Sequence, residues 1–376
     1  MITRFAITIL ALASAAHMVM GATMSMDSAR GEQLFSKLAC VGCHSINGQG
    51  GKIGPDLGGR MDRGFTPASL ASAMWNHAPV MWSSLRARGV VPGDVNEQAA
   101  ADLFAYFYSA RFFERPGDAG RGKQWFTEKH CADCHGLRQA TDPVAKPVVE
   151  WQSTGSSVAL VNAMWNHAST MRQEFARRKI SWPELTAQDL ADILLYVRNL
   201  PGSVHPAEAL VLSSSENGSV LFDSKGCDAC HSHSGKDALS AQLRGQTLVD
   251  VAVDMWNHAP RMAKEIPALN LDEMRELTGY LWAQQFFVDS GSPAAGKRVF
   301  TAKHCATCHD DASSGAPKLE NTRQTPFTAS AMVSVLWHHG AQMMEQMKSK
   351  GIPWPRFDGA QMTNLIAYLN SRGGGK

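Results

Sequence analysis

Residues 40–44 read Cys-Val-Gly-Cys-His, and this Cys-x-x-Cys-His pattern returns three more times along the chain. The later copies are Cys131-Ala132-Asp133-Cys134-His135, Cys227-Asp228-Ala229-Cys230-His231 and Cys305-Ala306-Thr307-Cys308-His309. The pattern is typical of the covalent attachment of a c-type haem. Its two thiols are spaced to form thioether bonds with the two vinyl groups of one porphyrin, and the adjacent histidine ligates the iron from one side.

A Cys-x-x-Cys pair also occurs in redox dithiols and in zinc sites. Here all 8 cysteines fall into the four copies, and a histidine follows each second cysteine directly. That arrangement favours haem over both alternatives. The sequence therefore predicts four covalently bound haem c groups. Their attachment points are Cys40, Cys43, Cys131, Cys134, Cys227, Cys230, Cys305 and Cys308, and their proximal iron ligands are His44, His135, His231 and His309.

The N-terminus has the order of a secretory signal peptide. Arg4 supplies a positive charge, an apolar run extends from Phe5 to Ala16, and small residues follow up to Ala22. The run is shorter than the about 20 residues that a membrane span needs. We predict a signal peptide over residues 1–22 and a periplasmic protein with no later transmembrane span; an uncleaved anchor is the alternative.

Length and charge narrow the class of protein further. A chain of 376 residues is long enough for several small domains. Its formal net charge of +2 is too small to indicate nucleic acid or an anionic membrane surface as the main partner.

Further residues recur when the copies are aligned on the first cysteine. A glycine stands nine residues before it and a phenylalanine five residues before it in every copy. They are Gly31, Gly122, Gly218 and Gly296, and Phe35, Phe126, Phe222 and Phe300. With the apolar residue beside each phenylalanine, this spacing predicts a short amphipathic helix that leads into the haem motif.

Two more helices are expected after each motif. One carries a tryptophan (Trp75, Trp165, Trp256 or Trp337) and begins after an N-cap residue nine positions earlier: Thr66, Ser156, Thr247 or Thr328. The other carries a tyrosine (Tyr106, Tyr196, Tyr280 or Tyr368) and begins after Asn96, Thr186, Asn270 or Asp358. The tryptophan and tyrosine lie 31 residues apart in copies one, two and four but 24 apart in copy three, which has therefore lost about two helical turns. We expect the aromatic residues to pack against haem or in an ordinary helix–helix core.

This order of features resembles the class I cytochrome c family, which has an N-terminal helix, a Cys-x-x-Cys-His motif, a methionine ligand and a final helix. The resemblance implies an all-α fold of four tandem small cytochrome c domains, each with a few helices around one haem. We place them at residues 27–116, 117–203, 212–290 and 291–376, joined by linkers rich in turn-forming residues. The longest linker, 201–215, indicates a division into two pairs of domains.

The sixth iron ligand has two candidates that recur in every copy. One is the histidine two residues after the tryptophan: His77, His167, His258 or His339. The other is the methionine six residues after it: Met81, Met171, Met262 or Met343. The methionine just before the tryptophan is replaced by Leu336 in copy four, so we assign that position to the core. The resemblance implies that the four later methionines ligate iron. A histidine beside a helix end more often makes a structural hydrogen bond or contacts a haem propionate than ligates a metal, and we expect that of the four histidines.

The family also holds the proximal histidine with the carbonyl of a proline. Pro55 in copy one and Pro317 in copy four match that element, and copy two offers Pro143 or Pro147. Copy three has no proline in the interval. Lys129, Lys225 and Lys303 stand two residues before a motif, and we interpret them as solvated surface residues.

Haems with a strong ligand on both sides leave no vacant site, which favours outer-sphere electron transfer over catalysis. Methionine ligation raises the reduction potential, which suits a respiratory or photosynthetic chain. The sequence predicts a periplasmic tetrahaem electron carrier without catalytic residues. Its partners would be redox proteins, such as a membrane respiratory or photosynthetic complex. The alternatives are a multihaem peroxidase or reductase with one five-coordinate haem, and an obligate haem subunit of a membrane complex.

Overall fold

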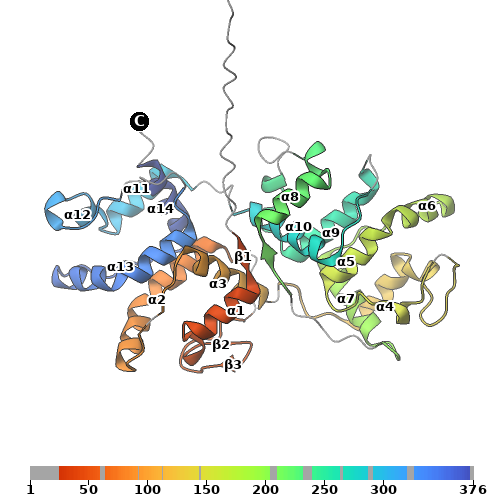
Figure 1. Ribbon diagram of the computed structural model, residues 1–376, viewed down its shortest axis with the longest axis horizontal. Helices are drawn as coiled ribbons and strands as arrows, with labels where there is room; N and C mark the ends of the chain where they lie inside the picture. Colours follow the sequence, from red (N-terminus) through yellow and green to blue (C-terminus); the bar gives the residue numbers. More distant parts are fainter. Residues whose placement is uncertain are drawn as a thin grey trace, which may run out of the picture.

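The computed structural model describes residues 25–59, 64–91, 93–111, 113–143, 145–203, 210–231, 239–262, 266–286, 291–319 and 326–372. Most of their regular structure is helical, and the strands are only two residues long (Figure 1). The predicted all-α fold is confirmed. The predicted signal peptide lies outside the described residues. No described helix combines the length and the apolar character needed to cross a lipid bilayer.

The helices form four units in chain order, and each unit contains one Cys-x-x-Cys-His motif. Unit one consists of α1 (Ser28–Lys37), α2 (Pro67–Ala87) and α3 (Glu97–Ser109), with β1 (Met26–Asp27), β2 (Ser45–Ile46) and β3 (Gln49–Gly50). Unit two consists of α4 (Ala119–Glu128), α5 (Ser157–Asn166), α6 (Ala168–Arg178) and α7 (Ala187–Arg198). Unit three consists of β4 (Ser213–Ser214), α8 (Glu216–Ser224), α9 (Leu248–His258) and α10 (Leu271–Gln284). Unit four consists of α11 (Pro293–Ala302), α12 (Ala306–His309), α13 (Ala329–Ser349) and α14 (Gly359–Ser371).

The eight predicted N-caps all act as caps. Each side chain accepts a hydrogen bond from a backbone N–H in the first turn of its helix, which satisfies a donor that has no intrahelical partner. The caps are Thr66, Ser156, Thr247 and Thr328 on the tryptophan helices and Asn96, Thr186, Asn270 and Asp358 on the final helices. The three helices predicted for each copy are therefore present.

The first and last helices of each unit cross at the repeated glycine. A Cβ atom added to Gly122 would lie 2.0 Å from the carbonyl oxygen of Asp192, so a larger residue does not fit there. One turn later Phe126 packs on Tyr196 with ring centroids 5.8 Å apart. The equivalent pairs have centroids 5.7, 5.9 and 5.4 Å apart: Phe35–Tyr106, Phe222–Tyr280 and Phe300–Tyr368. The glycine, phenylalanine and tyrosine thus form one repeated helix-crossing contact.

A polar contact that the sequence reasoning missed closes the same crossing. Asp192 is buried and accepts two hydrogen bonds from the Arg121 guanidinium, at 2.7 and 2.8 Å, and one from the Asp118 N–H. Asp102 and Arg30 repeat the pair in unit one. Glu276 and Asn364 hold the start of the first helix in units three and four. All four residues stand four positions before the repeated tyrosine, and that spacing could have revealed them.

The units lie in the spatial order four, one, three, two, which differs from their order along the chain (Figure 1). Helices α13 and α14 of unit four pack on α2 of unit one, and α5 of unit two packs on α9 of unit three. Units one and three meet at the centre, where β1 pairs with β4 and Phe104 stacks on Trp282. The division into two pairs predicted at the long linker is wrong, because that linker joins units two and three, which pack together; the paired units are one with four and two with three. Linker length does not determine which faces of the units are complementary.

Candidate haem-binding sites

The Cys-x-x-Cys-His stretch has the same backbone course in each unit. The residue before the first cysteine is left-handed, with φ of 60°, 63°, 77° and 64° at Ala39, His130, Gly226 and His304. A 3-10 turn follows in units one to three, and α12 follows in unit four. The N–H of the motif histidine then donates to the carbonyl of the first cysteine at 2.9 to 3.0 Å. This compact turn fixes the two thiols relative to the imidazole.

A backbone carbonyl orients the motif histidine wherever both residues are described. Nδ1 of His44 donates to the Pro55 oxygen at 2.9 Å, and Nδ1 of His309 donates to the Pro317 oxygen at 2.8 Å, so the prediction is confirmed in units one and four. Because Nδ1 carries the proton, Nε2 is left unprotonated and able to ligate a metal.

In unit two neither predicted proline supplies the acceptor. His135 donates to the carbonyl of Lys146, at 3.1 Å, and Lys146 is the residue before Pro147. The acceptor lies 11 residues after the histidine, as in unit one, so the course of the backbone and not the proline itself determines it. The corresponding interval of unit three includes residues 232–238, which lie outside the described part of the chain.

The thiols do not have the character of a redox dithiol. Burial raises the pKa of Cys40 and Cys305 to about 11 and that of Cys131 to about 12, whereas reactive dithiols have lowered pKa values. Among the described residues, no group of three or more His, Cys, Asp or Glu side chains could hold a metal ion. The two alternatives to haem therefore find no support in the site.

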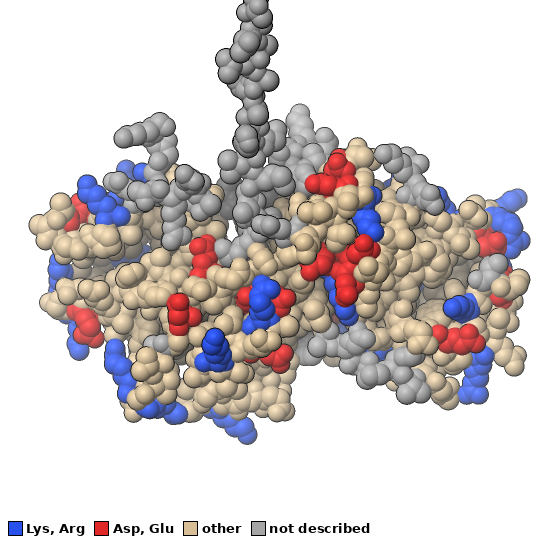
Figure 2. All heavy atoms as spheres, viewed as in Figure 1, with Lys and Arg blue, Asp and Glu red and all other residues tan. Residues whose placement is uncertain are grey.

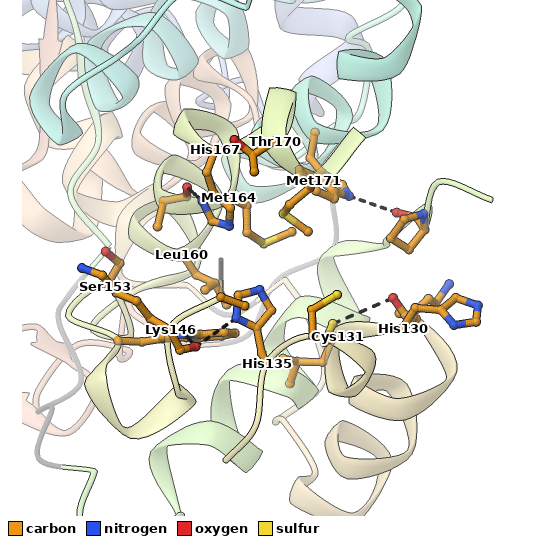
Figure 3. A pocket seen from close by; sticks show the side chains of 18 of the residues that line it. His130, Cys131, His135, Lys146, Ser153, Leu160, Met164, His167, Thr170 and Met171 are labelled. Atoms are coloured by element: carbon orange, nitrogen blue, oxygen red, sulfur yellow. Dashed lines mark hydrogen bonds between the residues drawn. The ribbon is translucent and has the colours of Figure 1, made fainter. Parts of the chain in front are cut away.

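The motif of unit two faces a cavity of about 480 Å³ (Figure 3). Cys131 and His135 enter it from one side, and His167 and Met171 approach from the other. Much of the remaining wall is apolar and includes Leu160, Phe175, Leu190 and Ile193. An apolar cavity with a pair of anchoring sulfurs and an imidazole suits a flat porphyrin, and its volume is in the range of cofactor sites. The residues present therefore fit a covalently attached haem.

A second histidine lies opposite the motif histidine in three units. The ring centroids of His44 and His77 are 6.0 Å apart, those of His135 and His167 are 6.3 Å apart, and those of His231 and His258 are 5.7 Å apart. Burial lowers the pKa of the second histidine in each pair, and the nearby motif histidine lowers it further. In unit four His339 is exposed and makes no ring contact with His309, both of which are described.

The family comparison matches this architecture. The profile described as "Cytochrome c" covers residues 28–110, 119–201 and 293–373. The chain belongs to the cytochrome c family. Searches of curated proteins and of solved structures gave no match. The three matched segments correspond to units one, two and four, and membership implies covalently bound haem and electron transfer through it.

The methionines predicted as sixth ligands of this cytochrome are all half-buried and packed against the core. Met81 and Met343 lie inside the long helices α2 and α13, and Met171 lies in α6. Met262 follows the 3-10 turn Ala259–Arg261 that ends the tryptophan segment of unit three. The predicted loss of two helical turns is visible after α9, where a 3-10 turn stands in place of the longer helical segment of the other units. Ligation of iron by these four methionines stays a prediction.

The sequence analysis interpreted the repeated lysines as solvated surface residues, and the structure shows instead that they contact other parts of their units. Nζ of Lys129 donates to the Glu184 carbonyl at 2.6 Å, and Nζ of Lys225 donates to the Ala268 carbonyl at 2.9 Å. Lys303 lies over the ring of Phe357. All three are half-buried and contact the segment before the last helix of their own unit. Their charges support the fold locally, which the motif spacing alone did not indicate.

The repeated tryptophans bind the neighbouring unit, a role that the sequence reasoning missed. The indole N–H of Trp165 donates to the Pro267 oxygen at 2.8 Å, and that of Trp256 donates to the Pro183 oxygen at 3.0 Å. Trp75 and Trp337 make the equivalent bonds between units one and four, to the oxygens of Pro355 and Gly93. Trp256 also lines the cavity of unit two, so a tryptophan of unit three forms part of the candidate haem site of unit two.

Proposed function

We propose that the chain is a tetrahaem cytochrome c that relays electrons between protein partners. The fourth haem would belong to unit three, which the family profile does not cover. Unit three repeats the helix before the motif, the helix crossing at Gly218 and the Phe222–Tyr280 contact. His231 faces His258 as the equivalent histidines face one another in units one and two. The same local structure supports the same cofactor.

The observation that carries the relay proposal is that a residue of unit three lines the haem cavity of unit two. Trp256 of unit three is fully buried and lines the cavity of unit two. Its hydrogen bond to Pro183 and its contact with Trp182, at a ring distance of 4.2 Å, hold the two sites together. The tryptophan contacts between units one and four and the contact of Phe104 with Trp282 continue the row. The units therefore offer a continuous path from unit two to unit four.

A bound haem supplies a one-electron carrier in each unit. A complete passage oxidises a donor protein by one electron and reduces an acceptor by one electron, and no covalent bond changes. The protein holds the motif histidines by carbonyl hydrogen bonds and packs apolar walls around the porphyrin. The outer units four and two are the natural contact points for the donor and the acceptor.

An exported, periplasmic protein is part of this proposal. The signal-like residues 1–22 and the confinement of all 8 cysteines to haem motifs support it. Figure 2 shows acidic and basic side chains interspersed over one face of the molecule, in keeping with the formal net charge of +2. We infer that partners recognise local contact surfaces at the outer units and not a strong overall field.

The alternative function is that of a multihaem peroxidase or reductase with one five-coordinate haem. Unit four is the best candidate for that haem. His309 lacks the facing histidine that its counterparts have, so a site at this unit depends on Met343. An open coordination position there would bind carbon monoxide in the ferrous state.

The test is to produce the full chain with its own N-terminus in a bacterium that attaches haem c, and to isolate it from the periplasm. We expect the intact mass to show four haems and the removal of the signal. The reduced protein should pass four electrons to a small oxidant and should not bind carbon monoxide. Fewer than four haems, or rapid carbon monoxide binding, would contradict a relay of closed haems.

A further inference from the structure

The segment around each repeated tryptophan carries two side chains that can ligate iron, a histidine and a methionine four residues apart. In unit two these are His167 and Met171, which both line the cavity on the side opposite His135 (Figure 3). A haem iron held by a proximal histidine takes one further ligand. Any assignment rests on the proposed function, since it presupposes a haem in each unit.

The distance between the facing histidines has the value that one metal ion between them requires. A metal–imidazole bond is about 2 Å long, so two of them in line place the ring centres about 6 Å apart. The three observed distances are 6.0, 6.3 and 5.7 Å. No hydrogen bond joins the two rings of any pair in the described part of the chain. The rings are therefore spaced for a shared atom and not for direct contact.

The hydrogen bonds of His135 and His167 leave the required nitrogens available. Nδ1 of His135 donates to the Lys146 oxygen, and Nδ1 of His167 donates to the Ala163 oxygen at 2.5 Å. Nε2 of each ring makes no hydrogen bond to a described residue, and Figure 3 shows the two rings pointing toward one another. Proteins commonly orient a metal-ligating histidine by occupying its other nitrogen in this way.

The structure of unit three distinguishes the histidine from the methionine as the candidate sixth ligand. In unit one His77 and Met81 lie on the continuous helix α2, so both keep fixed positions on one face. In unit three α9 ends at His258, and Met262 lies beyond a 3-10 turn in an extended conformation. The backbone that carries the methionine has changed, whereas His258 keeps its place opposite His231. The histidine thus keeps one relation to the motif in units one to three, whereas the backbone around the methionine differs between units one and three.

We propose that His77, His167 and His258 are the sixth iron ligands in units one, two and three, in place of Met81, Met171 and Met262. Met343 remains the predicted ligand in unit four, where His339 is exposed and does not face His309. Ligation by methionine raises the reduction potential of a haem relative to two histidines. Unit four, at one outer end of the row, would then hold the haem that is reduced most readily, and electrons would leave the protein there.

The decisive measurement is electron paramagnetic resonance with near-infrared magnetic circular dichroism on the full four-haem protein. We expect three haems with two histidine ligands and one with a sulfur-to-iron charge-transfer band, and a redox titration in which one haem is reduced before the other three. His167→Ala should convert one haem in four to a high-spin form that binds carbon monoxide. Met171→Leu, which removes the rival ligand from the same cavity, should create no high-spin haem.

The opposite pattern, in which Met171→Leu creates the high-spin haem and His167→Ala does not, would overturn the assignment. If His167→Ala fails to fold, the wild-type spectrum decides alone, since sulfur-ligation bands from three or four haems also contradict it. These outcomes differ from a failure of the proposed function, which would appear as fewer than four haems in the wild-type protein.

Discussion

The indole nitrogen of Trp256 lies 3.0 Å from the carbonyl oxygen of Pro183, although the two residues belong to different units. Trp256 is fully buried and also contacts Trp182 across the same boundary. This boundary joins two candidate haem sites. The contacts of Trp256 therefore help to keep units two and three adjacent.

Trp256→Phe should weaken the association of units two and three. The change removes the donor to Pro183 and part of a buried side chain, and we expect a loss of about 2 to 3 kcal/mol. Denaturant unfolding measures the loss, and hydrogen exchange locates it to α5 and α9. Trp125→Phe is the control, because Trp125 is half-buried within unit two and lies beside Lys129. Equal losses in the two variants would argue against an interface role.

The bidentate pair of Arg121 and Asp192 predicts a second effect on stability. Asp192→Asn removes the charge from a buried acceptor that binds Arg121 and the Asp118 N–H. We expect the crossing of α4 and α7 to lose about 3 kcal/mol. Thermal unfolding of the holoprotein measures it. Asp118→Asn is the control, since Asp118 is exposed and asparagine is an equally good N-cap, so a change of more than about 0.5 kcal/mol there would be unexpected.

Local elements of this fold were predictable because each depends on residues close in sequence. The glycine, phenylalanine and tyrosine of a unit meet through two helices whose spacing is regular, and the caps act within one turn. The carbonyl that binds His135 was misassigned because the expected proline is not itself needed. The carbonyl that accepts from the histidine is determined by the path of the backbone, and that path is difficult to predict from a single sequence.

The order of the units was not predictable for a different reason. It depends on contacts such as that of Trp165 with Pro267, between residues 102 positions apart. The indole N–H of a repeated tryptophan could donate to an acceptor in its own unit or in a neighbouring one. The spacing of the tryptophans in the sequence is the same in both cases. His167 was visible in the sequence as a repeated residue, but its position opposite His135 was not. Three-dimensional distance to the motif histidine is the information that the pattern lacked.

Ala39 should be replaceable by glycine with a gain in stability. Its φ of 60° is left-handed, its side chain is exposed, and Gly226 occupies the equivalent position in unit three. A left-handed conformation costs a residue with a Cβ about 1 kcal/mol, so Ala39→Gly should raise the free energy of unfolding of unit one by up to about that amount. Denaturant unfolding of the holoprotein is the measurement. Ala176→Gly, on the exposed face of α6, should instead lower stability by about 1 kcal/mol, and a loss in both variants would contradict the prediction.

The loop after the first haem motif should be sensitive to acid through Asp56. Its carboxylate accepts hydrogen bonds from the Gly48 N–H at 2.6 Å, the Ser45 hydroxyl at 2.8 Å, the Gly58 N–H at 2.8 Å and the Asn47 N–H at 3.0 Å. The bond from Gly48 contributes most and that from Ser45 next, and together they lower the pKa of Asp56 to about 2. The same loop positions the Pro55 carbonyl that orients His44.

Because the pKa of Asp56 is lower in the folded protein than the unfolded value of about 3.9, its stabilisation is fully present above pH 4 or so and is lost as the pH falls toward about 2. Asp56→Asn should therefore destabilise unit one at neutral pH and remove this acid-dependent step. Acid titration followed by hydrogen exchange of residues 45–58 measures both effects. Glu32→Gln, on the exposed side of α1, should retain the wild-type profile, and an unaltered acid step in Asp56→Asn would assign the transition to another group.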